Sequence, residues 1–249
     1  MNYESIQSLF SVKNKVILVT GSNRGNGLAI AEGLRLAGSI VIRIDVSFDD
    51  SAYEDDYVLD LTNLSLINPF INYIFEKYGR IDSLINNAGV SIPTSSPYSD
   101  YKSYENTLLV NLHAAFELCC NVCPIMSLNN TGSIINITSL GAELGFPNNP
   151  SYQVSKAGLR QLTKAIARDW SLKNIRANNI CPGYIKTEMT SASYKDPLLN
   201  IERQKRMLIK RWGESTDLIG AVIFLISEAS SYITGSDIYV DGGWTSNGL

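Results

Sequence analysis

Short apolar runs alternate with amphipathic stretches along most of the chain. Apolar runs of about five residues, bounded by polar residues or glycine, are typical of strands buried on both faces. Such runs predict strands at residues 15–19, 40–45, 57–61, 81–85, 133–138, 175–180 and 237–240. Apolar positions at helical spacing predict helices at residues 28–37, 64–78, 105–126, 152–172 and 217–227. This alternation of strand and helix predicts a doubly wound α/β fold.

Three segments interrupt the alternation. Residues 46–56 are few and have no apolar periodicity, so we expect no full crossover helix there. Residues 92–104 are loop-like, and residues 188–212 are polar and uneven, which suggests one or two short mobile helices. The sequence contains no repeat and no linker, so residues 1–249 are expected to form a single domain.

Composition narrows the class of protein. The apolar fraction of 45% and the charged fraction of 18% are typical of a globular protein with a large core. The net charge of -3 and the lack of a Lys/Arg-rich tract argue against nucleic acid as a partner. Residues 1–14 contain no continuous apolar run, and no stretch approaches the roughly 20 apolar residues of a membrane span. We therefore expect a cytoplasmic protein without a membrane partner.

The four cysteines raise the question of a metal site. Cys119, Cys120 and Cys123 lie in one apolar segment downstream of His113, and Cys181 follows a predicted strand. Adjacent cysteines on a helix point to different sides and do not easily share an ion. We expect buried, reduced thiols and no metal.

A glycine-rich turn joins the first predicted strand to the first predicted helix. Glycines at such a turn let the backbone approach a dinucleotide pyrophosphate, which the helix amides then bind. An ordinary tight turn is the alternative, but an acidic residue that ends the next strand favours the cofactor. The candidate residues of this turn are Gly21, Asn23, Arg24, Gly25, Asn26 and Gly27.

Asp45 lies where an acid would meet the adenosine ribose. A carboxylate accepts hydrogen bonds from ribose hydroxyls and repels a 2′-phosphate, and further acids follow it within residues 49–56. These acids favour NAD over NADP, whereas the guanidinium of Arg24 could bind a phosphate and favours NADP. We expect the acids to decide the preference. Asp60 and Leu61 end the third predicted strand and are candidates for contact with the adenine; Asp60 could instead cap the next helix.

Tyr152 and Lys156 are four residues apart and therefore share one face of a predicted helix. An ammonium beside a phenol stabilises the phenolate and lowers its pKa, which suits the tyrosine to acid–base catalysis. Such a pair also occurs by chance. Ser139 just past a strand and Asn111 in a helix are, taken singly, a turn hydroxyl and a helix-kinking polar residue.

Taken together, these motifs resemble the short-chain dehydrogenase/reductase family over nearly the whole chain. The turn Thr20-Gly-x-x-x-Gly25-x-Gly27 resembles the nucleotide fingerprint of that family, and Asn86-Asn87-Ala88-Gly89 resembles its second cofactor motif. Asn111, Ser139, Tyr152 and Lys156 fall in order on the catalytic tetrad of the family. The further cofactor contacts that the resemblance implies are Asn87, Ala88, Gly89, Pro182, Gly183, Ile185 and Thr187, with Tyr152 and Lys156 also reaching the cofactor.

The resemblance implies a seven-stranded parallel Rossmann sheet, a homotetramer or homodimer, and hydride transfer between a nicotinamide and an alcohol or ketone. In that mechanism Tyr152 moves the hydroxyl proton and Ser139 holds the substrate oxygen. Lys156 lowers the tyrosine pKa and binds the nicotinamide ribose, and Asn111 holds a water. Two features depart from the family pattern: Asn26 replaces an aliphatic residue, and the third crossover is short.

The substrate is expected to contact residues 91–98, 141–149 and 190–207. These segments are polar and have no obvious basic anchor, with Asn148, Asn149, Tyr184 and Tyr194 available for hydrogen bonds. We expect a small hydroxylated substrate such as a sugar, polyol or sugar acid. The alternatives are an NADPH-dependent 3-oxoacyl-type ketoreductase and a catalytically silent nucleotide-binding sensor or scaffold.

Overall fold

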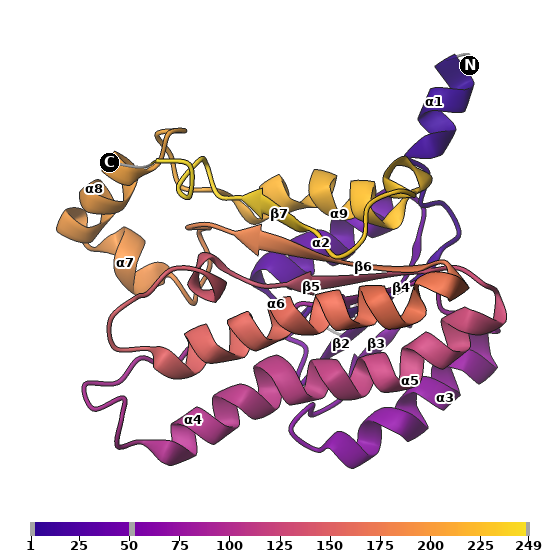
Figure 1. The fold of residues 1–249 in the computed structure, drawn as a ribbon, viewed down its shortest axis with the longest axis horizontal. Coiled ribbons are helices and arrows are strands. Elements are labelled where there is room, and N and C mark those ends of the chain that lie inside the picture. Colours follow the sequence, from indigo (N-terminus) through magenta and orange to yellow (C-terminus); the bar gives the residue numbers. More distant parts are fainter. Residues whose placement is uncertain (1–2, 50–52, 248–249) are drawn as a thin grey trace.

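Seven parallel strands form one sheet in the order β3-β2-β1-β4-β5-β6-β7 (Figure 1). The computed structural model describes residues 3–49 and 53–247. The strands are β1 (Val16–Thr20), β2 (Ile40–Asp45), β3 (Asp56–Val58), β4 (Ser83–Asn86), β5 (Gly132–Ile137), β6 (Ile175–Pro182) and β7 (Asp237–Val240). The strand order reverses between β1 and β4, and a crevice at the carboxyl ends of the strands is where doubly wound sheets bind their ligands.

Helices cover both faces of the sheet (Figure 1). One face packs on α2 (Gly25–Leu36) and α9 (Ile219–Ile226); the other packs on α3 (Ile67–Tyr78), α5 (Ala114–Leu128) and α6 (Pro150–Trp170). Strand β1 contributes to both layers, because Leu18 packs toward α3 and α5 and Ile17 packs toward α2 and α9. This double burial explains why the strands are continuous apolar runs, and it confirms the predicted fold class.

The helices differ from the predicted ones at two places. An additional helix, α1 (Tyr3–Leu9), precedes the sheet. The loop expected over residues 92–104 gives way at Tyr101 to α4 (Tyr101–Leu108), whose start is capped by the Asp100 carboxylate accepting from the Ser103 N–H at 3.0 Å. Helix α4 continues through a π-helical turn, η2 (Leu109–His113), into α5, so the long predicted helix begins four residues earlier than expected. A single capping aspartate in a polar stretch is a weak signal, which is why the sequence did not place this start.

The third strand is shorter than expected. It pairs with β2 only over residues 56–58, so Asp60 and Leu61 lie beyond its end and the predicted strand 57–61 was wrong there. Among the described residues between β2 and β3 no helix occurs, in agreement with the short crossover. The chain then enters α3 through the short helix η1 (Leu64–Leu66).

Two short helices, α7 (Ser191–Lys195) and α8 (Pro197–Arg206), occupy the polar segment after β6. They agree with the prediction for residues 188–212. The remaining short helices are η3 (Leu140–Ala142), η4 (Ser171–Lys173), η5 (Ser215–Leu218) and η6 (Glu228–Ser230). In Figure 1, helices α7 and α8 lie toward the same end of the molecule as the amino-terminal end of α6, which carries Tyr152.

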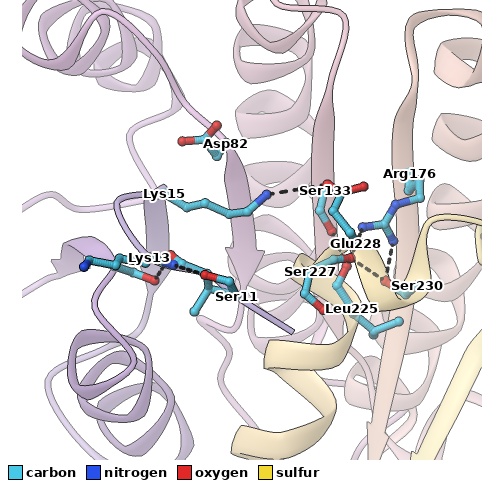
Figure 2. A network of polar contacts seen from close by, with 12 residues as sticks. Ser11, Lys13, Lys15, Asp82, Ser133, Arg176, Leu225, Ser227, Glu228 and Ser230 are labelled. Atoms are coloured by element: carbon cyan, nitrogen blue, oxygen red, sulfur yellow. Dashed lines mark hydrogen bonds and ion pairs between the residues drawn. The ribbon is translucent and has the colours of Figure 1, made fainter. Parts of the chain in front are cut away.

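At the amino-terminal ends of β5 and β6 a polar network connects α9 to the strands (Figure 2). Arg176 on β6 donates to the Leu225 carbonyl at 2.8 Å and to the Ser230 hydroxyl at 2.9 Å, and the Ser133 hydroxyl donates to the same Leu225 carbonyl at 2.8 Å. Burial lowers the pKa of the Arg176 guanidinium. These bonds satisfy carbonyls at the end of α9, where the helix itself offers no partner.

One helical stretch among the described residues, Tyr101–Leu128, is long and apolar enough to cross a membrane. It packs on α3 and α6, and many of its apolar side chains belong to the core beneath the sheet, whereas Phe116 and Leu128 are exposed.

Candidate active site

The glycine turn is packed so tightly that side chains cannot be accommodated. A Cβ at Gly27 would lie 2.0 Å from the Gly21 carbonyl oxygen, and a Cβ at Gly21, where φ is +64°, would lie 2.7 Å from the Ala88 Cα. The Asn87 amide donates to the Thr20 and Gly21 carbonyls, both at 2.9 Å. The two predicted cofactor motifs therefore lie against each other at the ends of β1 and β4, with an open backbone surface of the kind a pyrophosphate needs.

Asp45, at the end of β2, is hydrogen-bonded to the glycine turn. Its carboxylate accepts from the backbone N–H of Asn23 and from that of Val46, both at 2.8 Å. The Asn23 side chain in turn accepts from the Asp49 N–H at 3.2 Å. Each carboxylate oxygen keeps a lone pair, so the arrangement fits a ribose diol, which needs an acceptor at this position.

Two arginines near this end already have carboxylate partners. Arg24 pairs with Glu188 at 2.8 Å, and both side chains are more than 70% exposed. Arg43, which the sequence reasoning missed, is buried on β2 and donates to the Ser22 carbonyl at 2.9 Å and to Asp56 at 3.1 Å. A charged residue inside the apolar run 40–45 was the available signal for Arg43. Burial raises the pKa of the Asp56 carboxyl, and the Arg43 cation opposes that shift.

Asn26, the departure from the family pattern, has a partner of its own. Its side-chain oxygen accepts from the Ser215 hydroxyl at 2.8 Å and so links α2 to η5. Beside it, a Cβ at Gly25 would contact the Thr187 methyl at 3.6 Å. The glycine turn thus touches the segment after β6, as it must if both contact one cofactor.

Asp60 and Leu61 do not form the expected end of a strand. The Asp60 carboxylate accepts from the backbone N–H and the hydroxyl of Thr62, at 2.9 and 2.8 Å, which is a local turn on the surface. The Leu61 side chain is buried in the core. Only the backbone of Leu61 is therefore free for a ligand, and no helix begins at Asp60.

The segment after β6 is fixed to β7. The Gly183 N–H donates to the Val240 carbonyl at 3.0 Å, and a Cβ at Gly183 would lie 2.6 Å from the Asp241 Cα. Pro182 ends β6, and Ile185 is buried and paired with Gly213.

At the start of α6, Lys156 is buried and Tyr152 is half-buried. The Lys156 ammonium donates to the Ile137 carbonyl at 2.8 Å, and its nitrogen is 5.8 Å from the centroid of the Tyr152 ring. Burial lowers the pKa of Lys156 to about 8. Burial also raises the pKa of Tyr152, while a hydrogen bond with Ser139 opposes the rise. The expected lowering of the tyrosine pKa is therefore wrong for this arrangement, because desolvation disfavours the phenolate and the ammonium bonds to a carbonyl.

Asn111 lies in the π turn and joins three segments. Its side-chain oxygen accepts from the Val90 N–H at 2.8 Å, and its amide donates to the Val90 carbonyl at 2.9 Å and to the Ser155 hydroxyl at 3.0 Å. A Cβ at Gly89 would lie 3.3 Å from the Asn111 oxygen and 3.4 Å from the Lys156 nitrogen. Both amide hydrogens of Asn111 are used in these bonds. On this side chain, the expected water can therefore bind only to the remaining lone pair of the oxygen.

The loops that are expected to contact the substrate lie near these candidate catalytic residues. The Asn149 amide donates to the Ser91 hydroxyl at 2.8 Å, whereas its side-chain oxygen is buried and has no hydrogen-bond partner among the described residues. Tyr184 and Tyr194 pack against Trp212, with ring centroids 5.3 and 5.7 Å apart from it. The guanidinium of Arg203 on α8 lies 5.1 Å from the Tyr184 ring centroid, a cation that the sequence did not place there. A cavity of about 360 Å³ next to Tyr184 has none of the tetrad side chains in its lining.

The cysteines are mostly buried. Burial raises the pKa of the Cys123 thiol to about 12 and that of Cys181 to about 11. Cys120 is exposed, so the expectation of buried thiols was wrong for this residue, which points away from the core. No group of three or more metal-binding side chains occurs in the described part of the chain.

The fold and the paired motifs define a nicotinamide-dependent dehydrogenase of the Rossmann type. Residues 21–245 match the family model described as "Enoyl-(Acyl carrier protein) reductase", and the chain belongs to the short-chain dehydrogenase/reductase family. It is an oxidoreductase that acts on alcohol and ketone groups.

Several relatives cover nearly the whole chain. The chain is 36% identical to a 2-dehydro-3-deoxy-D-gluconate 5-dehydrogenase of Formosa agariphila, over 94% of both chains. It is 33% identical to the 5-keto-D-gluconate 5-reductase of Escherichia coli, over 96% of this chain and 98% of the relative. The solved structure of a gluconate 5-dehydrogenase from Burkholderia cenocepacia, in complex with NADP and tartrate, superposes with a TM-score of 0.91 at 33% identity, over 97% of this chain and 99% of that one.

Proposed function

We propose that this protein transfers hydride reversibly between NAD and a secondary alcohol of a small sugar acid or polyol. The observation that carries the proposal is the meeting of Ser139, Tyr152, Lys156 and Asn111 at the end of β5, beside the glycine turn. When bound, the nicotinamide supplies the hydride chemistry.

In this proposal the chain positions and protonates the reacting oxygen. Tyr152 gives or takes the hydroxyl proton at its Oη, and Ser139, whose hydroxyl lies on the same side of Gly141 as the Tyr152 ring, holds the substrate oxygen in line. Lys156 lies next to Gly89 and binds the nicotinamide ribose, and its charge favours the phenolate once it turns from the Ile137 carbonyl. The remaining contacts proposed for the cofactor are those of the glycine turn, Asp45 and residues 182–187.

NAD preference rests on charge at the adenosine end. Asp45 is oriented by two backbone N–H groups and would repel a 2′-phosphate. Both nearby arginines have carboxylate partners that compete with a phosphate, since Arg24 pairs with Glu188 at the surface and Arg43 with Asp56 in the interior. The NADP seen in the Burkholderia structure belongs to that protein.

A sugar acid is favoured by the relatives and by the site. Several relatives are named for gluconate-type substrates, and tartrate occupies one solved structure. The polar loops and the Arg203 cation beside Tyr184 suit hydroxyl and carboxylate groups. A ketoreductase for acyl carriers would need a basic surface to dock an acidic carrier, and the net charge of -3 does not favour one.

The activity is tested by a screen of keto-sugar acids, polyols and apolar ketones. We expect turnover of sugar acids or polyols, and a fall of about 100-fold or more in kcat for Tyr152→Phe, which lacks the transferable proton. Unchanged NADH binding by the variant would show that the loss is chemical. Preference for apolar ketones would refute the substrate class, and no turnover at all would favour the silent sensor or scaffold.

The cofactor is tested by titrating wild type and Asp45→Ala with NADH and NADPH, followed by intrinsic fluorescence. Wild type should bind NADH more tightly, and Asp45→Ala should shift toward NADPH by about tenfold or more, since it removes one repelled charge. Tighter NADPH binding by wild type would mean that Arg24 leaves Glu188 for the phosphate.

We also propose that the chain assembles as a homotetramer or homodimer in the cytoplasm. The outer face of α5 and α6 supports assembly, because a groove of about 420 Å³ there is lined mainly by apolar side chains. Phe116 on this face is 52% exposed.

A further inference from the structure

Gln153 makes three hydrogen bonds to one loop. Its side-chain oxygen accepts from the Phe146 N–H at 2.9 Å, and its amide donates to the Phe146 carbonyl at 2.7 Å and to the Asn149 carbonyl at 2.9 Å. One partly buried side chain thus bonds three backbone groups of that loop, and the Asn149 carbonyl also accepts from the Gln153 backbone N–H at 3.4 Å. Only an amide of this length offers an acceptor and two donors together.

The loop that Gln153 holds is joined to a second loop. The Asn149 amide donates to the Ser91 hydroxyl at 2.8 Å, and the Thr94 N–H donates to the Asn148 carbonyl at 3.3 Å. Residues 91–94 follow directly on Val90, which Asn111 fixes through both of its backbone groups. The two loops therefore form one continuous wall, with Gln153 at one end and Asn111 at the other.

This wall lies beside Ser139 and Tyr152. Gln153 follows Tyr152 on α6, and a Cβ at Gly141 would lie 3.5 Å from the Gln153 Cγ, 3.6 Å from the Ser139 hydroxyl and 3.6 Å from the Tyr152 ring. Any movement of residues 141–149 would thus change the space next to the phenol. The glycine turn for the cofactor makes none of these contacts.

We propose that Gln153 is a positioning residue that sets the substrate side of the active site. It fixes the wall made by residues 146–149 and 91–94 at a constant distance from the Tyr152 hydroxyl. The inference rests on the proposed function for the identity of the substrate. It predicts that losing the clamp weakens substrate binding and leaves cofactor binding unchanged.

The decisive variant is Gln153→Met, which keeps the length of the side chain and removes all three bonds. We expect KM for the sugar acid or polyol to rise about tenfold or more, with kcat changed by less than about threefold and NADH affinity unchanged. Gln161→Met is the matched control, because Gln161 is an exposed residue of the same type on the same helix. An equal KM for Gln153→Met and Gln161→Met would overturn the proposal.

Gln153→Glu separates the clamp from mere packing. The introduced carboxylate still accepts from Phe146 but has no hydrogen for the two carbonyls, and protonation restores one donor. The KM of Gln153→Glu relative to wild type should therefore fall as the pH is lowered through the pKa of that carboxyl. A ratio that does not change with pH would count against the proposal, and this variant also decides the case if Gln153→Met does not fold.

Hydrogen–deuterium exchange tests the clamp without any substrate. The Phe146 amide should exchange about tenfold faster in Gln153→Met, while amides of β5 remain protected. If wild type turned over no sugar acid or polyol, the proposed function would fail, and the exchange data would still decide the clamp. Unchanged Phe146 exchange would overturn it.

Discussion

At the scale of single residues, Lys156 is held in the interior with one backbone carbonyl as its partner. A buried ammonium with one neutral acceptor is costly, and burial lowers its pKa from an ordinary 10.5 to about 8. The chain thus retains a destabilising group exactly where the chemistry needs a cation next to a phenol and a ribose. Such a conflict between stability and activity is typical of active sites.

Replacing this cation should make the protein more stable and inactive. Between about pH 8 and 10.5 the unfolded chain binds a proton at Lys156 that the folded chain does not, so stability rises with pH there. The penalty is complete below about pH 8 and amounts to roughly 3 kcal/mol as an upper estimate. Lys156→Met should therefore raise the free energy of unfolding at pH 7, and the gain should shrink toward pH 10.5.

Denaturant unfolding at both pH values measures this difference, and Lys164→Met, an exposed lysine on the same helix, is the control. A gain that is equal at pH 7 and pH 10.5 would mean that added apolar packing, rather than the removed charge, stabilises the variant.

The site residues differ in how readily the sequence reveals them. The glycine turn and the spacing of Tyr152 and Lys156 are local patterns with a physical reason, and the structure brings them together. Arg43 and Gln153 were not found, because their partners are backbone groups and a carboxylate that only the folded chain places nearby. The direction of the Tyr152 pKa was wrong for the same reason: burial is a property of the fold.

At the scale of elements, the strands were predicted well because a strand buried on both faces needs apolar residues at successive positions, which gives a continuous apolar run. The exception is β3, an edge strand that pairs on one side only and over residues 56–58, so it needs less apolar sequence. The start of α4 depends on the Asp100 cap, and the π turn at residues 109–113 lies where the three bonds of Asn111 to Val90 and Ser155 connect the helix to its neighbours. Long-range bonds of this kind leave no periodic signal in the sequence.

At the scale of the whole molecule, the order of the strands concentrates the chemistry. The ends of β1, β2 and β4 carry the cofactor motifs, and the ends of β5 and β6 carry Ser139 and the segment 182–187. Sequence order alone does not show which strands are neighbours. The family resemblance implied a seven-stranded parallel sheet, which the structure confirms, and the strand order is a finding of the structure. At the amino-terminal ends of β5 and β6, Arg176 and its hydrogen-bond partners connect α9 to the sheet and have a structural role.

A substitution on the outer face of α5 and α6 tests the oligomeric state of the protein. Phe116 is 52% exposed beside a groove lined by Leu64, Leu112, His113, Glu117 and Leu162, and an aromatic ring there is costly to leave in water. Phe116→Asp should place a charge in the apolar centre of an interface and convert a dimer or tetramer into smaller species, as measured by light scattering with size-exclusion chromatography. Tyr232→Asp, a fully exposed position away from this face, should leave the assembly intact.

Because α6 also carries Tyr152 and Lys156, a smaller species with reduced activity would indicate that assembly supports the catalytic helix. A wild-type monomer, or an unchanged mass for Phe116→Asp, would show that this face is not the interface.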